Sequence, residues 1–125
     1  MAERMFILYV ADQEAATAFY TRVFGREPEM HVPGMTEFVL DAASSLGLMP
    51  EAGIKRLLGE AMPDPSAGGG APRAELYLVL EDAEAHHARA LDAGARELQP
   101  MKPMPWGQSV AYCLDPDGHV LAFAK

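Results

Sequence analysis

The sequence has little of several features that would assign it quickly to a class. Its single cysteine, Cys113, excludes an internal disulfide framework, and no Cys/His spacing typical of a structural zinc site is present. The apolar run at residues 5–11 is too short to span a bilayer, and Glu3 and Asp12 flank it where a signal peptide needs basic residues. We therefore expect a cytoplasmic protein with no membrane partner and no targeting segment.

Positive charge is also scarce. The 125 residues include 10 Lys and Arg against 18 Asp and Glu, which gives a formal net charge of −8. Because contacts to phosphates require clustered Lys and Arg, a nucleic-acid partner is not expected. Half of the residues are apolar, which suits one globular domain that buries its own core. An acidic surface can also attract a cationic ligand.

What the sequence does contain is a pattern that occurs twice. An apolar strand is followed by an aspartate that begins a helix, by a glycine that ends the helix, and by three shorter strands. The pattern predicts strands at 4–10, 27–31, 36–40 and 45–49 around a helix between Asp12 and Gly25, then strands at 75–80, 96–101, 108–114 and 119–124 around a helix between Asp82 and Gly94. The fold class is therefore α+β, with two βαβββ modules.

The expected boundaries follow from this repeat. Residues 4–50 form the first module and residues 74–125 the second, within one domain that spans 1–125. Residues 51–73 connect them through a short helix near 54–62 and a flexible stretch at 63–72 that is rich in Pro and Gly. The last turn, Asp115-Pro116-Asp117-Gly118, predicts a hairpin between the final two strands.

Several segments resemble a known family. They are Tyr9-Val10-Ala11-Asp12, Phe19-Tyr20-Thr21-Arg22-Val23-Phe24-Gly25, Pro105-Trp106-Gly107-Gln108 and Asp115-Pro116-Asp117-Gly118-His119. Together they are similar to the vicinal oxygen chelate superfamily, which includes glyoxalase I, extradiol dioxygenases, fosfomycin-resistance proteins and bleomycin-resistance proteins. The resemblance implies two curled mixed sheets with helices outside and a ligand on the inner face. It also implies a homodimer.

Metal enzymes of this family take one ligand from the first strand and one from the last strand of each module. Counted from the turns, these positions fall on Met5, Leu48, Glu75 and Ala122. Only Glu75 has a donor that suits Fe, Mn, Ni or Zn, and one carboxylate does not make a site. We therefore expect no metal and no cofactor, and we compare the chain with the metal-free bleomycin-resistance type.

The remaining candidate ligands and nucleophiles have structural interpretations. His86 and His87 are adjacent on a helix and cannot chelate from one face. His119 follows a turn glycine, and His31 lies at a strand end. Cys113 lies within a strand, where a structural thiol is the simplest interpretation, so no catalytic residue is predicted.

Aromatic residues and one carboxylate remain as candidates for binding a small molecule. Such a set suits a flat or cationic compound through stacking, cation–π contact and ion pairing. Trp106, in a loop at the mouth of a strand, and Glu75, a carboxylate in an otherwise apolar strand, are the strongest candidates. The predicted ligand-binding residues are Trp106, Glu75, Tyr77, Tyr9, Phe38 and Tyr112.

Three functions are compatible with these residues. The first is a metal-free protein that binds and sequesters a cationic or aromatic compound such as an antibiotic. The second is a lyase, isomerase or dioxygenase of the same superfamily, with a metal site or with Glu75 as general base. The third is a regulatory or partner-binding module with a vestigial cavity.

Overall fold

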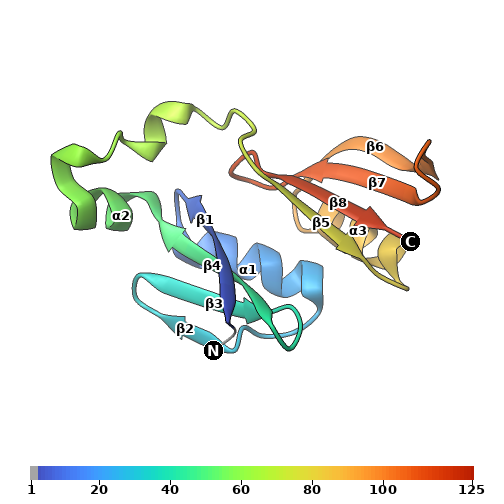
Figure 1. Ribbon diagram of the computed structural model, residues 1–125, viewed down its shortest axis with the longest axis horizontal. Coiled ribbons are helices and arrows are strands. Elements are labelled where there is room, and N and C mark those ends of the chain that lie inside the picture. The colour runs from blue at the N-terminus through green and yellow to red at the C-terminus, as the bar shows by residue number, and fades with distance from the viewer. Residues whose placement is uncertain (1–2) are drawn as a thin grey trace. The chain divides into compact units, whose positions relative to one another are not determined.

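The computed structural model describes residues 3–125, which form two units of similar topology (Figure 1). One unit comprises residues up to 21 together with 25–69, and the other comprises 22–24 together with 70–125. The strand order is β1-β4-β3-β2 in one sheet and β5-β8-β7-β6 in the other. In both sheets the first strand pairs in parallel with the last, and the other pairs are antiparallel. The predicted α+β fold of two βαβββ modules is confirmed.

The first module contains β1 (Arg4–Val10), α1 (Gln13–Phe24), β2 (Met30–Val32), β3 (Met35–Val39) and β4 (Ser44–Pro50). Asp12 begins α1, because its Oδ1 accepts a hydrogen bond from the amide of Ala15 at 2.9 Å. Gly25 ends the helix in the left-handed conformation at φ 69°. The side chains of Thr17 in α1 and Thr36 in β3 share a buried hydrogen bond of 2.8 Å, which shows which face of the sheet meets the helix.

The connection begins with α2 (Glu51–Leu58), continues as a 3₁₀ helix at Gly59–Ala61 and includes a second 3₁₀ helix at Pro65–Gly68. The sequence predicted a later helix and no regular structure after residue 62. The second 3₁₀ helix forms because Pro65 suits its first position and Asp64 Oδ1 accepts a hydrogen bond from the amide of Ser66 at 2.9 Å.

The second module contains β5 (Glu75–Val79), α3 (Ala83–Asp92), β6 (Arg96–Pro103), β7 (Ser109–Leu114) and β8 (Val120–Ala124). Asp82 precedes α3 as predicted but makes no side-chain cap hydrogen bond. Its carboxylate lies 3.1 Å from Nδ1 of His86 instead. The aromatic ring of Phe123 in β8 packs against His86 and His87 of α3, so Phe123 faces the helix.

Across residues 3–125, no helix is long and apolar enough to cross a membrane.

Candidate functional site

Each sheet has one face that packs on its helix and one face that is turned away from it, which we call the open face. Directly paired residues of neighbouring strands share a face, and successive residues alternate. Leu48 pairs with Thr36, which bonds to α1, so Leu48 faces the helix and is fully buried. Gly47 therefore occupies the open face in β4, where it pairs with Glu37 and Ile7.

The sequence comparison placed the first module's last-strand equivalent of a metal ligand at Leu48. This placement is wrong by one residue, because Leu48 faces the helix. In the first module the open-face residue Gly47 lies six residues after Asp41, where the turn begins. In the second module the equivalent residue, Ala122, lies seven residues after Asp115. Counting both turns alike places Leu48 on the wrong face. The corrected residue, Gly47, has no side chain that could bind a metal.

The open faces therefore do not fit the metal centre of the family's metal enzymes. The first module offers Met5 and Gly47 at the relevant positions, and the second offers Glu75 and Ala122. A lone carboxylate is the only oxygen donor in this set, and neither Gly nor Ala supplies a ligand. No step that depends on such a metal can be assigned to these residues.

The histidines of the described chain are each held by one carboxylate. The pairs are His31 with Glu14 at 2.9 Å, His86 with Asp82 at 3.1 Å, His87 with Glu97 at 2.9 Å and His119 with Asp115 at 3.0 Å. Within residues 3–125, no three His, Cys, Asp or Glu side chains are grouped so that they could hold a metal ion.

Polar and aromatic side chains gather on the open face of the second sheet. Tyr77, Ala122, Tyr112 and Gln99 form a continuous row across β5, β8, β7 and β6. Tyr112 also packs against the buried cluster of Val110, Ala122 and Ala124. The small side chain of Ala122 thus separates two tyrosines on one surface.

The turn between β6 and β7 brings an indole to this row. Backbone hydrogen bonds from Met104 to the Gln108 carbonyl, at 2.8 Å, and from Gly107 to the Met104 carbonyl, at 3.1 Å, close the turn, with Gly107 at φ 97°. Trp106 Nε1 then donates to the Tyr77 hydroxyl at 3.0 Å. The Tyr77 hydroxyl in turn donates to Oε1 of Gln108. Both ring systems remain accessible, since Tyr77 is 37% exposed and Trp106 is 54% exposed.

Glu75 adds the negative charge of this surface. It lies two residues before Tyr77 on β5, on the same face, and is exposed. Desolvation by burial raises the pKa of Tyr112, and the charges of Glu75 and Tyr77 add to this shift. A phenol is already neutral at physiological pH, and the upward shift keeps Tyr112 neutral at still higher pH.

Four predicted ligand-binding residues, Trp106, Glu75, Tyr77 and Tyr112, thus belong to one open face, in the second module. The other two lie in the first module. Tyr9 is half-buried on the open face of β1, whereas Phe38 is fully buried on the helix-facing side, two residues from Thr36. The expectation that Phe38 lies on the inner face is corrected, because strand alternation assigns its ring to the core.

Sequence reasoning missed the carboxylate of Glu37. Its side chain lies on the open face of the first sheet, is 4% exposed, and accepts a hydrogen bond from the hydroxyl of Ser45 at 2.7 Å. The signal was present, because Glu37 alternates with Thr36 and Phe38 inside a predicted strand. A charged residue inside a buried strand indicates a polar partner on the neighbouring strand.

Comparison with known proteins agrees with this architecture. The family model of the Glyoxalase/Bleomycin resistance protein/Dioxygenase superfamily matches residues 4–123. The chain belongs to this superfamily. An uncharacterized protein of Mycobacterium tuberculosis, Rv0887c, is 29% identical over 115 residues, which cover 90% of this chain and 67% of that protein.

Solved structures share the fold. A glyoxalase-related enzyme from Fulvimarina pelagi superimposes with a TM-score of 0.79 at 23% identity, covering 99% of this chain and 86% of that one. A glyoxalase/bleomycin resistance protein/dioxygenase family enzyme from Burkholderia phytofirmans has a TM-score of 0.79 at 19% identity, covering 99% and 98%. At this level of identity the likeness concerns the fold alone.

Proposed function

We propose that this chain is a metal-free small-molecule-binding protein of the glyoxalase/bleomycin resistance type. It binds, and thereby sequesters, a cationic or aromatic compound such as an antibiotic. The observation that carries the proposal is the grouping of Trp106, Tyr77, Tyr112 and Glu75 on the open face of the second sheet. A homodimeric state belongs to the proposal, and light scattering tests it.

Each group has a distinct role in this proposal. The accessible rings of Trp106 and Tyr77 offer π faces on which a flat or cationic ligand stacks. Glu75 supplies the charge that favours a cation. The hydrogen bonds of the Tyr77 hydroxyl to Trp106 and Gln108 fix the two rings before the ligand arrives, which lowers the entropic cost of binding.

The test is a thermal-shift screen with cationic glycopeptides, planar antibiotics and neutral aromatic compounds. A ligand at a hundredfold excess over its Kd adds about 2.7 kcal/mol of stability, which shifts the melting temperature measurably. Elemental analysis of the purified protein accompanies the screen. Stoichiometric Fe, Mn, Ni or Zn together with turnover would contradict the proposal.

Two variants then locate the site. Trp106→Ala is expected to weaken binding about tenfold with little loss of stability, because the ring is largely exposed. Glu75→Gln is expected to weaken the binding of cationic ligands and to leave the affinity for neutral ligands unchanged. Glu81→Gln removes another exposed carboxylate of the same module and serves as the control. Unchanged affinity in both site variants would place the ligand elsewhere.

A further inference from the structure

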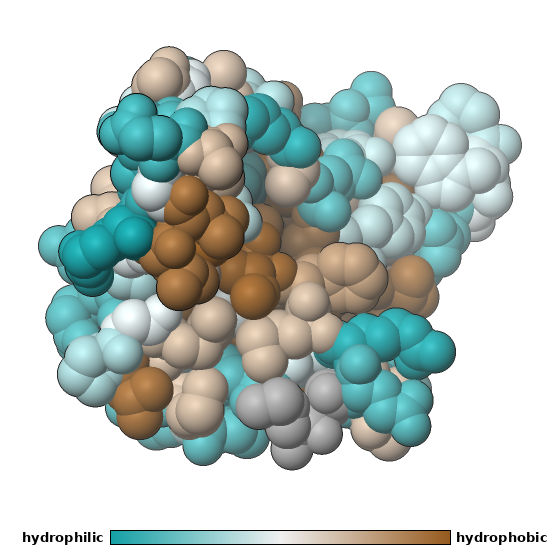
Figure 2. All heavy atoms as spheres, turned by 60° about the vertical axis from the view of Figure 1, so that its left-hand side comes forward, coloured by the Kyte–Doolittle hydropathy of each residue, from teal (hydrophilic) through white to brown (hydrophobic). Residues whose placement is uncertain are grey.

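A groove in the first module shares no lining residue with the open face of the second sheet. Its volume is about 480 Å³, within the range of small-molecule sites, and it is lined by Gly34, Met49, Gly53, Arg56 and Leu57. Figure 2 brings the side of the molecule that carries α2 forward and shows apolar atoms gathered at the surface there. Leu57 is 70% exposed, and Met49 is half-buried.

Gly53 is the first indication that this groove is kept open. It is the third residue of α2, and glycine favours the helical conformation less than alanine does. Packing within the protein does not require it: a Cβ at this position would meet only Cβ of Pro50 at 3.8 Å and Cε of Met49 at 3.9 Å, which are ordinary contacts. The protein's own side chains therefore do not need the space that a methyl group would occupy at Gly53. That space is part of the groove.

The turn that contributes Gly34 to the groove is held by two side-chain hydrogen bonds. Oε1 of Gln13 accepts a hydrogen bond from the amide of Gly34 at 2.9 Å, and Nε2 of Gln13 donates to the carbonyl of Val32 at 2.8 Å. A Cβ at Gly34 would meet nothing within 4 Å, so open space lies beside this turn. The groove is thus formed in advance of any ligand.

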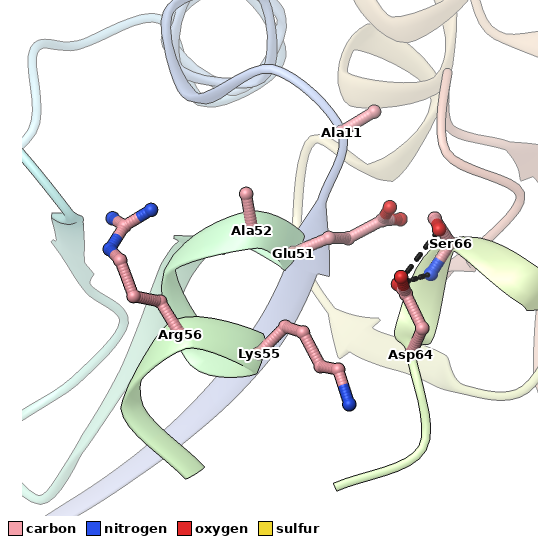
Figure 3. A pocket seen from close by; sticks show the side chains of 7 residues that line it. All are labelled: Ala11, Glu51, Ala52, Lys55, Arg56, Asp64 and Ser66. Atoms are coloured by element: carbon pink, nitrogen blue, oxygen red, sulfur yellow. Dashed lines mark hydrogen bonds between the residues drawn. The ribbon is translucent and has the colours of Figure 1, made fainter. Parts of the chain in front are cut away.

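Arg56 supplies a positive charge without a competing partner. The neighbouring Lys55 is occupied, since its Nζ donates to the carbonyls of Gly59, at 3.0 Å, and Met62, at 2.5 Å. Arg56 has no hydrogen bond or ion pair to any residue of the described chain. Figure 3 shows a second pocket, of about 380 Å³, in which the side chains of Glu51 and Asp64 lie on the side away from the Arg56 guanidinium.

From these observations we infer that the groove binds a free small amphipathic carboxylate. The carboxylate pairs with the guanidinium of Arg56, which matches its fork geometry, and the apolar chain lies between Met49 and Leu57 over Gly53. The flexible thioether of Met49 adapts to the shape of the chain. This site is independent of the proposed function, because it uses none of the residues that carry that proposal.

The experiment uses decanoate below its micellar concentration, with decyltrimethylammonium as the charge-reversed probe. Amide resonances of the full chain are followed by NMR, in which the signals of Gly34 and Gly53 report on the groove. Decanoate is expected to shift both signals saturably, and decyltrimethylammonium is not. Arg56→Gln should weaken decanoate binding at least tenfold, whereas Arg4→Gln, which removes an exposed arginine of the same module outside the groove, should not.

Gly53→Ala separates a binding role from a structural one. It should raise the melting temperature by about 3 °C and weaken decanoate binding about fivefold, because the methyl group occupies the groove. The inference is overturned if decanoate causes no saturable shift, if Arg56→Gln binds it unchanged, or if Gly53→Ala gains stability without losing affinity. Binding only to vesicles of anionic phospholipid, and not to free decanoate, also overturns it.

Discussion

Gly118 is expected to be a position of the second module where even a methyl group is poorly tolerated. The residue has φ +90°, and a Cβ added to it would lie 2.0 Å from the carbonyl oxygen and 2.8 Å from the carbonyl carbon of Gly70. Both obstacles are backbone atoms, so no side-chain rotation relieves the overlap. The connection that contains Gly70 or the turn that contains Gly118 must move.

The turn itself resists such movement. The carboxylate of Asp115 accepts hydrogen bonds from the amides of Asp117, at 2.9 Å, and His119, at 2.8 Å, and the amide of Gly118 donates to the Asp115 carbonyl at 3.0 Å. Positive φ costs an alanine about 1–2 kcal/mol, and forced displacement of packed atoms costs about 1–3 kcal/mol. Gly118→Ala should therefore lower the free energy of unfolding by about 2–5 kcal/mol.

Gly94→Ala is the matched control, because Gly94 has φ +111° in the same module and a Cβ there would meet nothing within 4 Å. This variant should lose only the conformational term, about 1–2 kcal/mol. Urea denaturation at an unchanged m-value measures both variants. Equal destabilisation of the two variants would refute the close approach of Gly70 to Gly118.

Two further variants test buried groups. Burial, and secondarily the charges of Asp115 and Glu97, raises the pKa of the Cys113 thiol from 9.0 to about 12. Because the unfolded chain releases this proton first, the free energy of unfolding should fall by about 1 kcal/mol between pH 9 and pH 10, and urea titrations should show that Cys113→Ala removes this part of the decline. Ser45→Ala should cost about 1–3 kcal/mol by leaving the buried carboxylate of Glu37 without its donor, and a loss under about 0.5 kcal/mol in urea denaturation would contradict that assignment.

Local chemistry explains why much of the fold was predictable from the sequence. Asp12 and Gly25 act through atoms within four residues of themselves, so their effect on α1 can be predicted without knowledge of the remaining chain. The alternation of β5 likewise assigned Glu75 and Tyr77 to the open face. Asp82 shows the limit, because a histidine one turn later attracts the carboxylate that would otherwise cap the helix.

Features that depend on distant residues could not be predicted in the same way. The hydrogen bond between Trp106 and Tyr77 joins residues 29 positions apart, and it depends on how the turn after β6 reaches back over β5. The error at Leu48 arose from a turn that is one residue shorter than its counterpart. A shift of one residue moves a side chain to the other face of the sheet. Counting the turn one residue too long therefore assigned Leu48 to the open face instead of the helix-facing side.

The corrected position also shows how the two modules differ at equivalent places of their sheets. Gly47 and Ala122 are both small residues in the last strand of their sheets, each opposite a large side chain on the first strand. Above Gly47 the space is filled, because a Cβ there would lie 2.8 Å from Sδ of Met5 and 3.0 Å from Cγ1 of Ile7. Above Ala122 the neighbours are two phenols, one of which is accessible and held by an indole. At this position the first open face is therefore filled by apolar side chains, whereas the second keeps polar groups and π faces accessible, which is why we propose the second module as the site of the aromatic or cationic ligand.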